Sequence, residues 1–118
     1  MKLLIADDNP ALRALLRQLC ADVATEMREC ANGAEEVAVF KDFQPDWTLM
    51  DLAMPELDGL AATTKIKKAF PGARIIVITQ QRGPEYHEAA LNAGACALLL
   101  KEDLHSLPHL LGNASTRL

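Results

Sequence analysis

MKLLIADDNP, residues 1–10, begins the pattern on which the fold prediction rests. The run Leu3–Ala6 is apolar without polar alternation, and two aspartates follow it directly. Asn9 and Pro10 then provide a helix cap and a proline suited to a first helical turn. A short run that is apolar on both faces is typical of a strand inside a parallel sheet. These ten residues therefore predict a buried strand that passes through an acidic turn into a helix.

The same kind of apolar run recurs three more times along the chain. The further runs are Trp47–Met50, Ile75–Ile78 and Ala97–Leu100. Like the first run, they suit strands that are buried on both faces. A fifth strand is predicted at Glu26–Cys30, where apolar and charged residues alternate, as is typical of a partly exposed strand at a sheet edge.

Helical patterns separate the predicted strands. After Pro10, apolar residues follow the spacing of one helix face, at Leu12, Leu15, Leu16, Leu19, Cys20 and Val23. A second helix is predicted from Gly33 to Phe43. In it, Val37 and Phe40 are expected to face inward, and Glu35, Glu36 and Lys41 outward.

Three more helices complete the alternation. One begins at a cap on Asp58 and ends at Phe70, and the next runs from Glu85 to Asn92. The last begins at Asp103 or at Ser106, with Pro108 inside it or in its first turn. Five strands that alternate with five helices predict an α/β fold of three layers, and 118 residues suit one domain, residues 1–118.

The composition excludes several classes of protein. Lys and Arg total 12 and Asp and Glu total 16, so the formal charge of −4 gives no overall basic field for nucleic acid or an anionic membrane. No apolar run approaches the roughly 20 residues of a membrane span. The three cysteines, Cys20, Cys30 and Cys96, lack metal-binding spacing, and the first residues lack a signal-peptide pattern. We therefore expect a reduced protein of the cytoplasm.

Polar residues follow four of the five predicted strands. Asp7 and Asp8 follow the first, Asp51 the third, Thr79 the fourth and Lys101 the fifth. Taken singly, each has an ordinary explanation as a turn residue, a cap, a strand end or a surface charge. In an open parallel sheet, however, ligands bind beyond the carboxyl ends of the strands. We therefore expect these five side chains to meet at one edge of the sheet.

Such a meeting of carboxylates has a chemical consequence. At ~4 Å and an effective dielectric near 20, each pair of carboxylates repels by about 4 kcal/mol, so the cluster needs a cation, raised pKa values, or both. Oxygen ligands favour Mg²⁺. A carboxylate that faces Mg²⁺ beside an ammonium and a hydroxyl is arranged to accept a phosphoryl group. Asp51 is the predicted nucleophile, because it is the central acid and its neighbours on both sides can reach it.

Residues 49–59, LMDLAMPELDG, resemble the phosphoacceptor segment of two-component response-regulator receiver domains. Asp7, Asp8, Thr79 and Lys101 match that family's other signature positions, and the resemblance covers nearly the whole chain. It implies a flavodoxin-like, five-stranded parallel sheet of order 2-1-3-4-5.

The same resemblance implies a role for each site residue. Asp51 would take a phosphoryl group from a sensor histidine kinase or a phosphotransfer protein. Asp8, Asp51 and the backbone carbonyl of Ala53 would hold Mg²⁺, with Asp7 acting through water. Thr79 and Lys101 would contact the phosphoryl group.

The implied function is that of a signalling module and not of an enzyme with turnover. Phosphorylation would change the conformation and regulate a downstream output domain or protein, either with this chain standing alone or as the receiver part of a transcriptional regulator. A homodimer formed on phosphorylation stays open, and no direct contact with nucleic acid or membrane is expected. Two alternatives remain: a pseudo-receiver that acts only through protein contacts, and an aspartyl-phosphate hydrolase. Leu52 and Ala53 stand where the hydrolase signature Asp-x-Asp would continue.

Four positions depart from the usual receiver pattern. Leu98 stands where most members have Tyr or Phe, and Glu102 stands where Pro usually follows the lysine. The residue after Thr79 is Gln80, which is larger than usual, and Pro108 is unusual in the final helix. A Lys-x-Asp ending resembles receivers attached to helix-turn-helix outputs. These departures concern the change of conformation on phosphorylation and the surface that contacts the downstream partner. They leave the acceptance of a phosphoryl group unchanged.

Overall fold

The computed structural model describes residues 1–53 and 58–116, and for residues 113–116 only the course of the helix. The predicted Met54-Pro55 part of the signature loop lies outside the described residues. Strands and helices alternate along the chain as β1 (Lys2–Ala6), α1 (Pro10–Leu19), β2 (Glu26–Cys30), α2 (Gly33–Phe43), β3 (Trp47–Asp51), α3 (Gly59–Ala69), β4 (Ile75–Thr79), α4 (Pro84–Ala93), β5 (Ala97–Leu100), the 3₁₀ helix η1 (Lys101–Ser106) and α5 (Leu107–Thr116).

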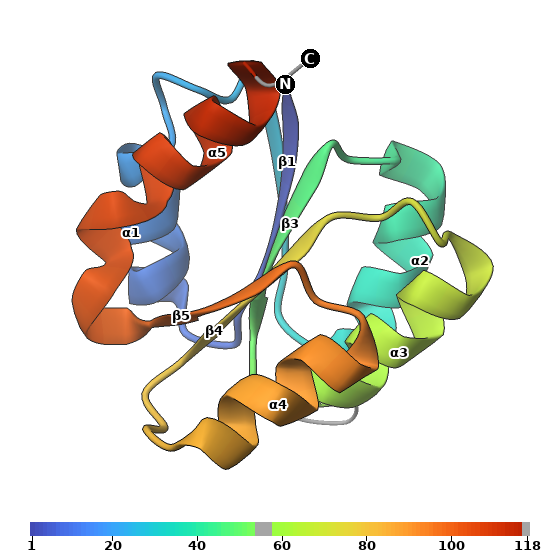
Figure 1. Cartoon of the computed structure of the whole chain (residues 1–118). Coiled ribbons are helices and arrows are strands. Elements are labelled where there is room, and N and C mark those ends of the chain that lie inside the picture. The colour runs from blue at the N-terminus through green and yellow to red at the C-terminus, as the bar shows by residue number, and fades with distance from the viewer. Residues whose placement is uncertain (54–57, 117–118) are drawn as a thin grey trace.

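The five strands form one parallel sheet in the order β2-β1-β3-β4-β5, which confirms the predicted flavodoxin-like arrangement. Helices α1 and α5 cover one face of the sheet, and α2, α3 and α4 cover the other (Figure 1). Because all strands run the same way, their carboxyl ends lie at one edge. In register, Ala6 pairs with Met50 and Thr79 with Leu100, so the residues that follow these strands emerge close together.

Two apolar cores lie on either side of the sheet, because successive side chains of a strand point to opposite faces. In β1, Leu4 packs toward α2 and α3, while Leu3 and Ile5 pack toward α1 and α5. All three are fully buried. Each such side chain contributes roughly 1.5–3 kcal/mol relative to an exposed position. The short apolar run of β1 thus serves both cores and holds the centre of the sheet.

Side-chain caps fix the helix starts next to the carboxyl edge. The Asn9 side chain accepts hydrogen bonds from the N–H groups of Ala11 (2.9 Å) and Leu12 (3.4 Å), and Asp58 accepts one from Ala61 N–H (2.8 Å). Both predicted caps are confirmed. Such caps are worth about 1 kcal/mol each.

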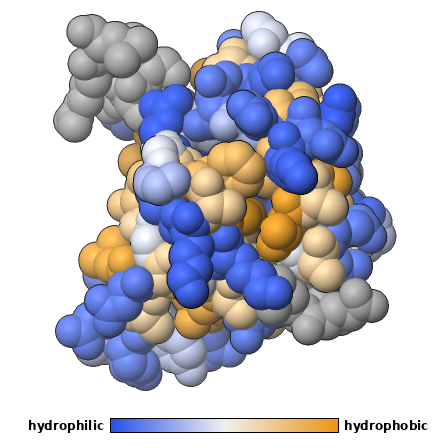
Figure 2. Space-filling model, turned by 90° about the vertical axis from the view of Figure 1, so that its right-hand side faces the viewer, coloured by the Kyte–Doolittle hydropathy of each residue, from blue (hydrophilic) through white to orange (hydrophobic). Residues whose placement is uncertain are grey.

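Figure 2 shows the side of the molecule formed by α2 and α3, on which apolar residues lie in patches among hydrophilic ones. A shallow hollow of about 360 Å³ opens between the carboxyl ends of these helices, and Phe40, Pro45 and Phe70 are among the residues that line it. It lies at the edge of the sheet where the strands begin, away from the predicted site. Within residues 1–53 and 58–116, no helix combines the length and apolar character needed to cross a bilayer.

The structure corrects the predicted orientation of several residues. Helix α1 ends at Leu19, so Val23 lies beyond it, and Leu15 is 42% exposed because the predicted apolar stripe is wider than the face that meets the sheet. Glu36, predicted to face outward, is fully buried. It shares the buried face of α2 with Gly33, Phe40 and Phe43, which recur at the spacing of one helix face.

In the carboxyl-terminal third of the chain, the structure corrects one prediction and decides between two alternatives in another. All four residues of β5 are half-buried, because this strand lies at the sheet edge and has only β4 as a neighbour. The final α-helix begins at Leu107, directly after Ser106, with Pro108 in its first turn. Asp103, the other predicted start, lies inside η1 with a non-helical backbone.

Candidate functional site

The structure brings the predicted site residues to one edge of the sheet. Asp7 and Asp8 follow β1, Asp51 ends β3, Thr79 ends β4, and Lys101 comes directly after β5. A cleft of about 280 Å³ opens there, and its lining consists of Asp8, Asn9, Asp51, Ala53, Thr79, Gln80, Gln81 and Lys101. The strand ends are adjacent because the sheet is parallel, so the site follows directly from the fold.

Three carboxylates cluster at this cleft: Asp8 and Asp51 line it, and Asp7 lies buried beside them. Asp7, Asp8 and Asp51 each place an oxygen within 4.8 Å of the others. Asp51 is 5% exposed and Asp7 only 2%, whereas Asp8 is exposed to solvent. A hard divalent cation that prefers oxygen ligands, above all Mg²⁺, fits this set of donors.

The electrostatics of the cluster support the same assignment. Burial, together with the neighbouring charges of Asp7 and Asp8, raises the pKa of Asp51 to about 6, against the opposing effects of Lys101 and of a backbone hydrogen bond from Ala53. Burial is also the main cause that raises the pKa of Asp7. Mutually repelling, partly desolvated carboxylates gain more from a bound cation than isolated surface acids do.

Lys101 and Thr79 supply the complementary groups. The Lys101 ammonium lies 3.6 Å from Oδ1 of Asp51, and its side chain is 24% exposed. The Thr79 hydroxyl oxygen accepts a hydrogen bond from the N–H of Gln81 at 2.9 Å. Because that bond uses an oxygen lone pair, the hydroxyl hydrogen can be donated to a group bound in the cleft.

The start of α3 holds the backbone around Asp51. Leu52 N–H donates to the carbonyl of Ile78 and Gly59 N–H donates to the carbonyl of Leu52, both at 2.9 Å. A side chain at Gly59 would overlap the carbonyl oxygen of Asp51. The glycine is therefore required where the helix meets the strand end, while Asp58 caps that helix.

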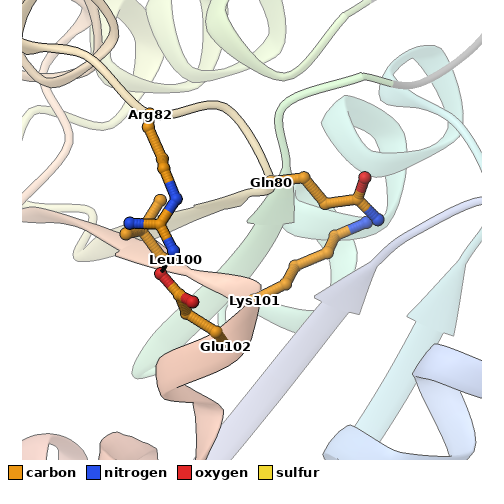
Figure 3. Close-up of a pocket in the computed structure, with 5 residues that line it drawn as sticks. All are labelled: Gln80, Arg82, Leu100, Lys101 and Glu102. Carbon is orange, nitrogen blue, oxygen red and sulfur yellow. Dashed lines mark hydrogen bonds and ion pairs between the residues drawn. The ribbon is translucent and has the colours of Figure 1, made fainter.

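A second set of side chains borders the cleft on the side of β5. Figure 3 shows Gln80 and Lys101 reaching toward each other from the ends of β4 and β5. On the far side of the same hollow, of about 200 Å³, Arg82 pairs with Glu102. Gln80 thus lines the way to Asp51, as expected for a side chain larger than usual, and the Arg82 pair was not predicted.

Leu98 is half-buried and packs against the core formed with α2, α3 and α4. It therefore fills part of the interior from the edge strand.

Sequence reasoning also missed Arg13, whose guanidinium donates to the backbone carbonyl of Asp7. The pattern of apolar residues in α1 gave no reason to single it out. The position of Arg13 could have indicated this contact. Arg13 lies one helical turn after the cap residue Asn9, on the side of the helix nearest the acidic turn.

Comparison with known proteins identifies the class that this fold and site define. The sequence profile of the response regulator receiver domain matches residues 3–111. The chain belongs to this family, whose members are mainly signalling modules of two-component systems that bind Mg²⁺ at an acidic pocket and interact with histidine kinases and output domains.

Individual relatives include regulators of two kinds. The chain is 42% identical to the uncharacterized transcriptional regulatory protein YhcZ of Bacillus subtilis over 104 residues, which are 86% of this chain and 49% of that protein. It is 36% identical to the chemotaxis protein CheY of Halobacterium salinarum over 100 residues, which are 85% of this chain and 83% of CheY. The chain thus spans about half the length of some relatives and most of the length of others.

Solved structures show the same fold. A DNA-binding response regulator of the LuxR family from Staphylococcus aureus superposes with a TM-score of 0.87 at 25% identity, over 98% of each chain. CheY in the CheX-CheY-BeF₃-Mg complex of Borrelia burgdorferi gives a TM-score of 0.91 at 22% identity, over 99% of this chain and 90% of that one.

Proposed function

We propose that residues 1–118 act as one receiver domain that accepts a phosphoryl group onto Asp51, with Mg²⁺, from a sensor histidine kinase or a phosphotransfer protein. The observation that carries the proposal is the position of the Asp51 carboxylate. It lies in an open cleft with two further carboxylates on one side and the Lys101 ammonium 3.6 Å away on the other.

The chemistry is a transfer between two nucleophiles. An oxygen of Asp51 forms a bond to phosphorus, while the bond between phosphorus and the donor, an imidazole nitrogen of phosphohistidine, breaks. Asp8, Asp51 and the Ala53 carbonyl would hold Mg²⁺, with Asp7 acting through water. When bound, Mg²⁺ neutralises charge on the phosphoryl oxygens. Lys101 would pair with one of these oxygens, and Thr79 would donate its hydroxyl hydrogen to another.

Phosphorylation would then regulate a downstream partner through a change of conformation. That partner would be an output domain or a separate protein, since some relatives are transcriptional regulators and others are CheY proteins. A homodimer of the phosphorylated chain is one form that this regulation could take. The proposed compartment is the cytoplasm, on the argument from cysteine content, with no direct contact to nucleic acid or membrane by this domain.

The test is incubation with acetyl phosphate in the presence and absence of Mg²⁺, followed by mass spectrometry of the intact chain and its peptides. We expect one phosphoryl group, on Asp51, that appears only with Mg²⁺. Continued release of phosphate from unrelated phosphomonoesters would instead favour a hydrolase. A folded protein that binds neither Mg²⁺ nor phosphoryl groups would be a pseudo-receiver.

Asp8 and Lys101 are expected to affect Mg²⁺ binding differently. The Asp8→Ala variant should bind Mg²⁺ more than about tenfold more weakly. Loss of a residue that only positions a metal ligand weakens binding about tenfold, and loss of the ligand itself should cost more. The Lys101→Ala variant should bind Mg²⁺ as tightly as wild type or slightly more tightly, because a repelling charge is removed. Calorimetric titration measures both affinities. A folded Lys101→Ala protein without Mg²⁺ binding would contradict the role given to Lys101.

The affinity for Mg²⁺ should depend on pH in one direction. Because the pKa of Asp51 is raised to about 6, protons compete for this ligand in weakly acidic solution. Mg²⁺ binding should therefore be tight at about pH 8 and weak at about pH 5. The affinity should fall around the raised pKa of about 6, and not in the lower pH range where ordinary carboxyl groups titrate. Titration across this range checks the prediction. An unchanged affinity at the lower pH would show that Asp51 is not a ligand.

A further inference from the structure

Arg13 links helix α1 to the acidic turn through two hydrogen bonds made at once. Its Nη1 donates to the backbone carbonyl of Asp7 at 2.7 Å, and its Nε donates to Oε1 of Glu29 at 3.0 Å. The other oxygen of Glu29 accepts from Nη1 of Arg17 at 2.8 Å. Glu29 lies on β2 next to β1, so the network joins the two strands and α1 beside the turn.

This contact completes a set of restraints on Asp7. The N–H of Asp7 donates to the carbonyl of Cys30 at 3.1 Å, and its Oδ1 accepts from the N–H of Asn9 at 2.8 Å. With Arg13 on its carbonyl, the peptide planes before and after Asp7 are both held. The plane after Asp7 includes the nitrogen of Asp8, so its orientation decides where the Asp8 side chain starts.

We propose that Arg13 is a positioning residue for the metal site, which fixes the peptide between Asp7 and Asp8 so that both carboxylates face Asp51. This inference rests on the proposed function, since it gives the Asp7 and Asp8 carboxylates the role of metal ligands. Arg13 itself contacts neither the metal nor the phosphoryl group. Its side chain is 20% exposed, so its bond to Asp7 is partly shielded from water.

A positioning role and a charge effect of Arg13 predict opposite changes in Mg²⁺ affinity when the residue is replaced. The guanidinium charge beside Asp7 would repel a bound cation, so loss of the charge alone should tighten Mg²⁺ binding. Loss of the positioning bond should weaken it. An Arg13→Lys variant keeps the charge, but an ammonium does not have the planar fork that serves Asp7 and Glu29 together. The substitution therefore isolates position from charge.

The experiment compares wild type, Arg13→Lys and the control Arg17→Lys, which changes a residue bonded to Glu29 but not to Asp7. Calorimetric titration should show Mg²⁺ binding about tenfold weaker in Arg13→Lys, as for other partners that hold metal ligands, and unchanged in Arg17→Lys. Without metal, exchange of the Asp7 and Asn9 amide hydrogens in Arg13→Lys should be roughly fivefold faster, as loss of one ordinary hydrogen bond predicts.

The two readouts separate failure of this inference from failure of the proposed function. If wild type binds no Mg²⁺, the proposed function is wrong, and the metal-free amide exchange alone decides the role of Arg13. If folded Arg13→Lys matches wild type in both measurements, Arg13 is a surface partner of Glu29 and the inference is overturned. Should Arg13→Lys not fold, Glu29→Gln replaces it, because this variant removes the carboxylate that orients Arg13 and should show the same two changes in smaller measure.

Discussion

The Asp51→Asn variant is expected to take up no phosphoryl group and, in metal-free buffer, to be more stable than wild type. The first effect follows because an amide oxygen is a poor nucleophile toward phosphorus. The second follows because the substitution keeps the shape of Asp51 but removes the central charge from three clustered carboxylates. A gain of stability together with complete loss of phosphorylation is the signature of a functional site whose charges oppose folding.

The size and the pH dependence of the stability gain follow from the pKa of Asp51. In the folded protein that pKa is raised to about 6 from 3.8, so wild type retains full stability below the lower value and loses stability as the pH rises through the higher one. At pH values above the higher pKa, a shift of this size corresponds to roughly 2–3 kcal/mol of lost unfolding free energy. Asp51→Asn should recover about 2 kcal/mol of unfolding free energy near pH 7.5 and almost none near pH 4.

Urea denaturation with a chelator present measures this difference, with Asp22→Asn as a control at an exposed carboxylate. Added Mg²⁺ should stabilise wild type more than Asp51→Asn, since a ligand stabilises the state that binds it. Two results would refute the assignment of Asp51. One is stoichiometric phosphorylation of Asp51→Asn, and the other is a stability change no different from that of the control.

The fold could be predicted from the sequence because its strands are short and its strand ends are polar. A run such as Leu3–Ala6 is too short for a helix of ordinary length and too apolar for a surface loop. Asp51 and Thr79 stand where the apolar runs stop, and they prove to be the last residues of β3 and β4. The resemblance to receiver domains added the strand order, which local pattern does not determine.

The contacts between separate elements could not be predicted in this way. Arg13 and Glu29 are 16 residues apart, and their pairing depends on how α1 lies against β2. Arg82 and Glu102 are 20 residues apart and meet only because β4 and β5 are neighbours. Neither pair is marked by a motif or a periodicity in the sequence. Leu15, predicted to face inward, is exposed, and Glu36, predicted to face outward, is buried. Both predictions failed because helical periodicity does not say how wide the covered face of a helix is.

Of the corrected predictions, the burial of Glu36 has the largest consequence for stability. Its side chain is fully buried, and neither carboxylate oxygen has a hydrogen-bond partner. Burial raises the pKa of this carboxyl well above its usual value of 4.5. Burial raises the pKa of the Cys30 thiol to about 12, and the charge of Glu36 contributes to the same shift. A buried carboxyl without hydrogen-bond partners gives up its hydration without compensation, so the burial of Glu36 opposes folding.

Replacement of Glu36 by methionine should therefore stabilise the protein. Methionine has a similar length and no group that requires a hydrogen bond, and it adapts to an irregular space. We expect Glu36→Met to raise the unfolding free energy at pH 7 by about 2 kcal/mol, within the roughly 1–4 kcal/mol gained in favourable cases when buried ionic groups are replaced by well-packed apolar side chains. Glu36→Gln should give a smaller gain, since it removes the titration but leaves a buried amide without partners.

The pH dependence of the difference identifies its cause. A folded-state pKa above the unfolded value means that Glu36 is tolerated below about pH 4.5 and lowers stability progressively as the pH rises above it. The difference in unfolding free energy between Glu36→Met and wild type should thus be small near pH 4 and grow toward pH 7. Taking the difference removes the parallel contributions of Asp51 and Asp7, which both proteins share. A Glu36→Met protein that is less stable than wild type at pH 7, or a difference that does not vary with pH, would mean that Glu36 has a partner or reaches water in solution.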